Sequence, residues 1–75
     1  MNFDKYLLHD MYHVTYNLEI IQGYATKEKI LHHVRVSGER KNKHYKDEEI
    51  LKCLNHMETI RMFKQISKDK YVVNG

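Results

Sequence analysis

The 75-residue chain contains no proline and only two internal glycines, Gly23 and Gly38. Proline and glycine are the residues that most often interrupt helices and strands, so few positions here can end an element. The two glycines are therefore the strongest predicted boundaries in the chain. The apolar pattern on either side of each glycine then predicts what the segments form.

The segment before Gly23 has the pattern of an amphipathic helix. Its apolar residues recur at spacings of four and three: Leu7, Met11, Val14, Leu18 and Ile21. This spacing places them on one helical face. Asn2 or Asp4 would cap the start, and Gly23 stands where a glycine commonly follows the last turn. We expect a helix over about residues 3–22.

A second helix is predicted between the glycines. Thr26 is a favourable N-cap, and Glu28 lies in the first turn, where the helix dipole favours an acid. The short apolar face consists of Ile30, Leu31 and Val34. With Gly38 as the break, this helix covers about residues 27–36. Residues 37–46 follow with no apolar periodicity and are expected to form a basic loop.

A third helix is predicted over about residues 47–60. Asp47 would cap it, and Glu48 and Glu49 suit the dipole at its start. The inward face comprises Ile50, Leu51, Leu54 and Met57, with Cys53 beside them.

Strand-type residues follow the third helix. Met62, Phe63 and Ile66 precede a polar Ser67-Lys68-Asp69-Lys70 segment, and Tyr71-Val72-Val73 follow it. Two short strands around a four-residue turn predict a β-hairpin over about residues 62–73. An isolated hairpin is marginal in water, so this one must pack against the helices.

These elements predict an α+β fold, mostly α, with three helices followed by a C-terminal β-hairpin. Seventy-five residues suffice for one domain, residues 1–75, with a thin margin of stability. The predicted core consists of Leu7, Met11, Val14, Leu18, Ile21, Ile30, Leu31, Val34, Ile50, Leu54, Met57, Phe63, Ile66 and Val72.

Charge is distributed unevenly along the chain. Residues 1–25 contain one lysine and three acids, whereas residues 26–75 contain twelve lysines and arginines and seven acids. Nine of the thirteen basic residues fall in residues 35–46 and 61–70. Clustered positive charge is an argument about partners, and it favours nucleic acid.

Helix 3 and the hairpin together resemble a known family. The segment DEEILKCLNHMETIRMFKQISKDKYVV, residues 47–73, has an apolar-periodic helix, then aromatic and basic residues, then a lysine-bearing turn and a Tyr-Val-Val strand. This order resembles winged helix-turn-helix domains, over about residues 26–73. The ten-residue basic loop departs from the tight turn that usually joins helices 2 and 3 in that family.

The resemblance implies that helix 3 enters the major groove of double-stranded DNA and that the wing contacts its backbone or minor groove. Asn and Lys side chains can read bases there, and basic residues on loops can reach phosphates. The acids Glu48, Glu49 and Glu58 on the same helix would repel phosphate. The expected nucleic-acid-binding residues are Arg35, Arg40, Lys41, Lys43, His44, Lys46, Lys52, Asn55, His56, Arg61, Lys64, Lys68 and Lys70.

An alternative function is a protein–protein interaction module that modulates a host or partner protein. Tyr6, Tyr12 and Tyr16 widen the apolar surface of helix 1, and tyrosine is enriched in interface cores. This surface would serve a homodimer or another protein partner. It would equally suit a central helix that the other elements cover.

Two metal sites are conceivable and are left open. His9 and His13 lie at i and i+4 of helix 1, and Cys53 and His56 form a C-x-x-H spacing near His32-His33. Neither provides the two paired ligand motifs by which zinc sites are usually recognised. No phosphate-binding glycine loop or nucleophile motif occurs in the sequence, so we expect no enzyme and no cofactor.

The number of cysteines and the hydropathy of the sequence indicate the cellular compartment. One cysteine allows no internal disulfide and fits a reducing compartment, and no apolar run approaches the length needed to cross a bilayer. We expect a cytoplasmic protein without membrane contact. By analogy, such a small lysine-rich chain suits a transcriptional or architectural accessory factor of a phage or mobile element.

Overall fold

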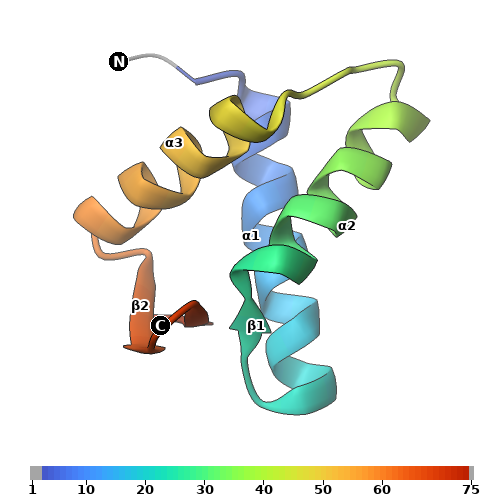
Figure 1. Cartoon of the computed structure of the whole chain (residues 1–75). Coiled ribbons are helices and arrows are strands. Elements are labelled where there is room, and N and C mark those ends of the chain that lie inside the picture. The colour runs from blue at the N-terminus through green and yellow to red at the C-terminus, as the bar shows by residue number, and fades with distance from the viewer. Residues whose placement is uncertain (1–2, 75) are drawn as a thin grey trace.

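The computed structural model describes residues 3–74 as three helices and three short strands (Figure 1). The elements are α1 (Lys5–Gln22), β1 (Ala25–Thr26), α2 (Lys27–Arg40), α3 (Asp47–Thr59), β2 (Phe63–Ser67) and β3 (Lys70–Val73). Three helices followed by an antiparallel strand pair confirm the predicted α+β, mostly helical fold.

The ends of α1 are set by local hydrogen bonds. The Asp4 carboxylate accepts a hydrogen bond from the Tyr6 N–H at 2.8 Å, so the helix begins two residues after the predicted residue 3. At the other end Gly23 adopts a left-handed conformation with φ of 90°, and its N–H donates to the Glu19 carbonyl at 2.7 Å. The predicted end at residue 22 is confirmed. The other predicted cap, Asn2, lies outside the described residues.

The predicted end of the second helix is wrong. α2 begins at Lys27 as predicted but continues to Arg40, four residues beyond residue 36. Gly38 does not break the helix, because it is buried inside it and faces the ring of Tyr45. A Cβ at this position would lie 2.6 Å from Tyr45 Cδ2. The glycine therefore provides room for a ring, and the loop shortens to residues 41–46.

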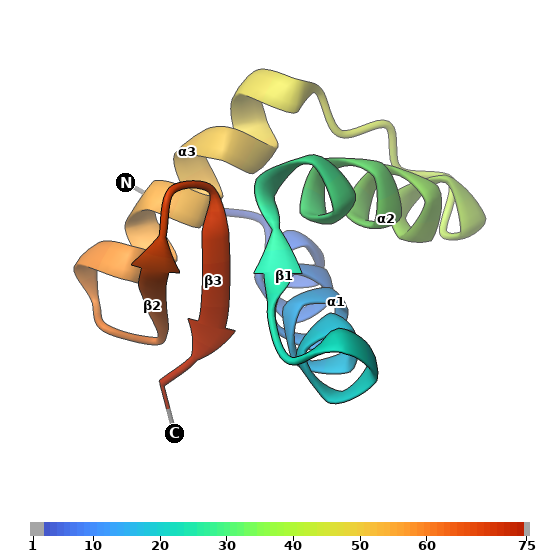
Figure 2. The same cartoon turned by 60° about the horizontal axis from the view of Figure 1, so that its bottom comes forward.

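A two-residue strand that the sequence analysis missed lies between α1 and α2. β1 pairs antiparallel with β3, with Ala25 opposite Tyr71, and the sheet order is β1-β3-β2 (Figure 2). Two residues are too few for any periodic signal. This strand ties the end of α1 to the hairpin.

The hairpin has a tighter turn than the predicted Ser67-Lys68-Asp69-Lys70 segment. Ser67 pairs with Lys70, so the turn contains only Lys68 and Asp69, and Asp69 has a positive φ of 60°. A bulge lies between Gln65 and Ser67. α3 ends at Thr59, one residue before the predicted end.

The core lies between α1 and the elements packed on one side of it. Its buried apolar residues are Leu7, Met11, Leu18, Ala25, Ile30, Val34, Tyr45, Ile50, Cys53, Leu54, Met57, Phe63 and Tyr71. Val14 and Leu31 are half-buried against this cluster. Val72 is half-buried as well.

Two predicted core residues are exposed. Ile21, in the last turn of α1, is 79% exposed, and Ile66, at the bulge of β2, is 49% exposed. Ile66 is the unpaired residue of the bulge, and it lies three residues after the buried Phe63, on the opposite face of a regular strand. Tyr45, Ala25 and Tyr71 are core residues that were not predicted, because they become buried only through contacts made outside their own segments.

The close approach of Gly38 and Tyr45 gives a test of the fold. Gly→Ala inside a helix normally stabilises by about 0.5–1 kcal/mol, but overpacking costs about 1–3 kcal/mol. Because the Tyr45 ring is buried, we expect Gly38→Ala to destabilise the protein in urea unfolding followed by circular dichroism. The double variant Gly38→Ala/Tyr45→Leu should recover part of the loss. A Gly38→Ala protein more stable than the wild type would contradict this packing.

Candidate nucleic-acid interface

Most of the predicted nucleic-acid-binding residues lie on the segments that precede and follow α3 in sequence, and Lys52, Asn55 and His56 lie on α3 itself. The end of α2 and the loop 41–46 precede α3, and the hairpin follows it (Figure 1). Arg40, His44 and Lys46 are exposed before α3, and Arg61, Lys64 and Lys68 are exposed after it. None of these six side chains takes part in an ion pair with another described residue.

Four of the predicted contact residues are instead held by acids of the same chain. The ion pairs are Arg35–Asp47 at 3.3 Å, Lys41–Asp10 at 2.6 Å, Lys43–Asp4 at 3.2 Å and Lys52–Glu48 at 3.3 Å. The Arg35 and Lys52 pairs lie at the surface, where such pairs contribute little to stability and can exchange for a phosphate.

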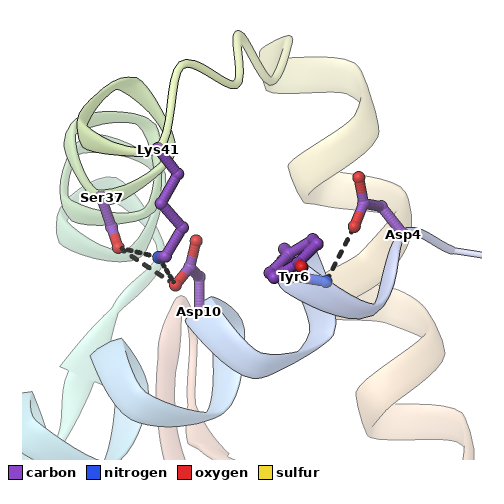
Figure 3. Close-up of polar contacts among 5 residues, drawn as sticks. All are labelled: Asp4, Tyr6, Asp10, Ser37 and Lys41. Carbon is purple, nitrogen blue, oxygen red and sulfur yellow. Dashed lines mark hydrogen bonds and ion pairs between the residues drawn. The ribbon is translucent and has the colours of Figure 1, made fainter.

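Lys41 differs because its partner is buried. Asp10 is 3% exposed, and its Oδ1 accepts hydrogen bonds from Ser37 Oγ at 3.1 Å and Lys41 Nζ at 2.6 Å (Figure 3). Lys41 Nζ also donates to Ser37 Oγ at 3.1 Å. A buried carboxylate requires such partners, so Lys41 stabilises the α1–α2 contact.

Lys43 has a similar structural role near the start of α1. Its ammonium donates to Asp4 Oδ2 at 3.2 Å and lies 4.8 Å from the centre of the Tyr6 ring. The pKa of Asp4 is lowered, chiefly because its carboxylate accepts the Tyr6 N–H, with Lys43 adding to the effect. Lys43 is therefore committed to the fold of its own chain.

Tyr45 anchors the loop between these two lysines. Its ring is buried against Gly38, and burial, with the nearby Asp4 and Asp10 charges, raises its pKa to about 12. The phenol therefore stays neutral and acts as part of the core. The loop is consequently fixed at Lys41, Lys43 and Tyr45, whereas His44 and Lys46 point to solvent.

The exposed face of α3 carries polar side chains between two hollows. A hollow of about 250 Å³ is lined by Phe3, Lys52, Asn55, His56 and Thr59. A second, of about 450 Å³, is lined by Lys27, Leu51, Leu54, Asn55, Glu58, Gln65 and Tyr71. Asn55 borders both hollows and is exposed. Its amide is therefore open to solvent between the two hollows.

His56 is less available than expected. Its ring is half-buried and lies 5.1 Å from the ring of Phe3, centre to centre. Phe3 thus covers this part of α3.

The acids at the start of α3 each have a local partner. Asp47 pairs with Arg35, Glu48 pairs with Lys52, and Glu49 Oε1 accepts the Lys46 N–H at 3.1 Å. These contacts and the helix dipole account for their presence. Glu58 is half-buried at the hollow beside the hairpin.

The hairpin tip is fastened to the start of α2. Lys27 pairs with Asp69 at 3.3 Å, and its pKa is raised, chiefly by that hydrogen bond. Lys70 lies over the Tyr24 ring at 4.5 Å. Lys64 and Lys68 therefore project from a hairpin whose position is fixed.

The residues considered for metals do not assemble into a larger set. Cys53 is buried, and burial raises the pKa of its thiol to about 11. Over residues 3–74, no group of three or more His, Cys, Asp or Glu side chains is placed to hold a metal ion. No helix in this range is both long and apolar enough to cross a bilayer.

Comparison with family models, curated proteins and solved structures finds no match to this chain.

The predicted partner surface of α1 lies apart from α3. Tyr6 is 45% and Tyr16 is 43% exposed, whereas Tyr12 is half-buried and stacks on Tyr16 with ring centres 6.1 Å apart. α1 is thus both the helix around which the core forms and a helix with an exposed aromatic face.

Lys41 pairs with a buried acid and Lys46 is exposed without an acidic partner, so the two lysines should differ in their effect on stability. Lys41→Gln leaves the buried Asp10 carboxylate without its cation, so we expect a loss of about 1–3 kcal/mol in the free energy of unfolding. Lys46→Gln removes the same charge from an exposed, unpaired position and should change the free energy of unfolding by less than about 0.5 kcal/mol. Urea unfolding of both variants provides the measurement. Equal losses would contradict a structural role for Lys41.

Proposed function

We propose that the protein binds double-stranded DNA, without catalysis, as a winged-helix domain. The observation that carries the proposal is the set of exposed cationic side chains at both ends of α3, Arg40 and Lys46 before it and Arg61, Lys64 and Lys68 after it. No described acid pairs with them. Three helices followed by an antiparallel strand pair also keep the element order of that family.

The dimensions of α3 support this arrangement. Thirteen residues form a helix about 20 Å long, and the major groove of B-DNA, about 12 Å wide, admits an α-helix between its two phosphate backbones. Cations at both ends of the helix are placed to reach phosphates on either side. Asn55, exposed in the middle of the helix, is the side chain best placed to contact a base edge.

The shortened loop strengthens the resemblance. Because α2 continues to Arg40, only residues 41–46 join it to α3, closer to the tight turn of the family than the ten residues predicted. Such a small domain would act as a transcriptional or architectural accessory factor, in the cytoplasm.

A protein partner is the second candidate, and the exposed face of α1 is the observation that favours it. Tyr6, Tyr16 and Ile20 are exposed there, and Lys5 and Lys43 lie over the Tyr6 ring at one end of the face. This face is separate from α3, so a protein partner and DNA would not compete for the same residues.

Salt dependence tests the proposed DNA contacts. Each phosphate contact contributes about −0.9 to the slope of log affinity against log salt on duplex DNA. We therefore expect Lys68→Gln to weaken binding to a labelled random duplex and to reduce the magnitude of the slope by about 0.9. The matched control is Lys29→Gln, since Lys29 is exposed and donates to Gln22 at the far end of α1.

Fluorescence anisotropy across a salt series measures both variants. Equal slopes for wild type and Lys68→Gln would remove the hairpin from the interface. No binding by the wild type at low salt would contradict the proposed function. Lys41 and Lys43 are unsuitable for this test because their loss disturbs the fold.

Asn55 should affect sequence preference rather than general affinity. If its amide contacts a base edge, Asn55→Ala should lower discrimination between the best and a mismatched site by about 1–3 kcal/mol. Selection from a random duplex library, followed by titration of the selected site, measures this. Thr59→Ala provides a control on the same face. Unchanged discrimination in Asn55→Ala would exclude this amide from base recognition.

A further inference from the structure

We propose that two copies of this chain pair antiparallel through the outward face of α1. This face carries a stripe with spacings of three, four, three and four: Tyr6, His9, His13, Tyr16 and Ile20. That is the a/d spacing by which one helix packs along another. The inward stripe of the same helix, from Leu7 to Leu18, is already buried in the core.

The outward stripe is unusual for a solvent-facing surface. All five of its residues are exposed, and none carries a formal charge at pH 7. On α2, by contrast, most exposed positions are charged: Glu28, Lys29, Arg35, Glu39 and Arg40. A chain with 31% charged residues therefore leaves the outer face of its longest helix almost uncharged.

The rings of this face form one continuous surface. His9 and His13 have ring centres 4.2 Å apart, Tyr12 meets His13 at 6.2 Å, and Tyr12 stacks on Tyr16 at 6.1 Å. Aromatic side chains supply large contact area with little loss of rotamer entropy. The face is thus pre-ordered for contact with a flat, similar surface.

Charges at the two ends of α1 favour a second copy in the antiparallel orientation. Lys5 flanks the stripe at its start, and Glu19 flanks it at its end on the same side. Glu19 Oε1 is held by the Val73 N–H at 2.7 Å, which fixes the position of its carboxylate. Antiparallel pairing brings Lys5 of each copy near Glu19 of the other. Parallel pairing would instead place Lys5 beside Asp10 of the other copy, whose carboxylate already pairs with Lys41.

A two-fold axis near Met11 then sets four residues of the stripe opposite one another. In heptad notation Tyr6 and His13 are a positions, and His9 and Tyr16 are d positions. In an antiparallel pair a positions lie opposite d positions, so His9 faces the second copy's His13 and Tyr6 faces the second copy's Tyr16. The contact is isologous, so it closes as a dimer and does not extend into a fibre.

This pairing is independent of the proposed DNA binding. α2 and α3 pack on the other side of α1, which runs behind both helices in Figure 1. The dimer therefore leaves the cations beside α3 exposed.

Sedimentation of the full chain over a concentration series tests the pairing. We expect the mass to rise from 9.1 kDa to twice that value as the concentration approaches about 100 µM, typical of a small interface. His13→Glu places a carboxylate inside the contact, where it must lose its hydration, and should raise the dissociation constant at least about tenfold. His32→Glu makes the same change at an exposed position of α2 and should leave it unchanged.

A monomer at every concentration would overturn the proposal and assign the stripe to a different protein. Equal effects of His13→Glu and His32→Glu would also overturn it, because the contact would then lie elsewhere.

Cross-linking tests the orientation. Cys53 is buried and its thiol has a pKa of about 11, so it should not react with a short bifunctional maleimide. A mixture of Tyr6→Cys and Tyr16→Cys chains should give the mixed cross-linked dimer, and Tyr6→Cys alone should give little product. Efficient self-cross-linking of Tyr6→Cys would overturn the antiparallel arrangement.

Discussion

The packing of the Tyr45 ring against Gly38 determines how the three helices meet. Because Gly38 has no Cβ, the ring lies against the backbone of α2, and the helix can continue to Arg40. This extension brings Lys41 within 2.6 Å of the buried Asp10 on α1. The ring and the ion pair together fix the loop 41–46. They thereby set where α3 begins relative to α1 and α2.

The same contacts divide the basic residues into two groups. Lys41 and Lys43 compensate acids of α1 and its cap, so their charges are already used within the chain. Arg40 and Lys46 adjoin them in sequence but face solvent without a described acid. A count of basic residues therefore overstates the charge that a phosphate backbone would meet. The charge that a phosphate backbone would meet depends on which basic residues lie next to acids of the same chain.

Local signals predicted the caps of α1 and α2, whereas the cap of α3 is Lys46 and not the predicted Asp47. Contacts made outside each helix explain the other errors. Asp4, Gly23 and Thr26 act on residues two to four positions away, so their effects could be read directly from the sequence. Gly38 was misread because its partner, Tyr45, lies beyond the end of the helix.

The site was predicted to a similar extent. The exposure of Lys64 and Lys68 followed from hairpin placement. The ion pair of Lys41 with Asp10 could not be predicted, because the two residues lie 31 positions apart in sequence. The position of Asp10 on the inward side of α1, three residues after Leu7, did indicate a buried acid that needs a partner.

A small chain buries only about 60% of its unfolded surface, so an uncharged exposed stripe is costly unless another surface covers it. A surface that binds phosphates must instead remain exposed and charged. The two sides of this fold differ in that way: α1 presents rings and α3 is flanked by cations, which is the arrangement that the proposed pairing and the proposed DNA binding require.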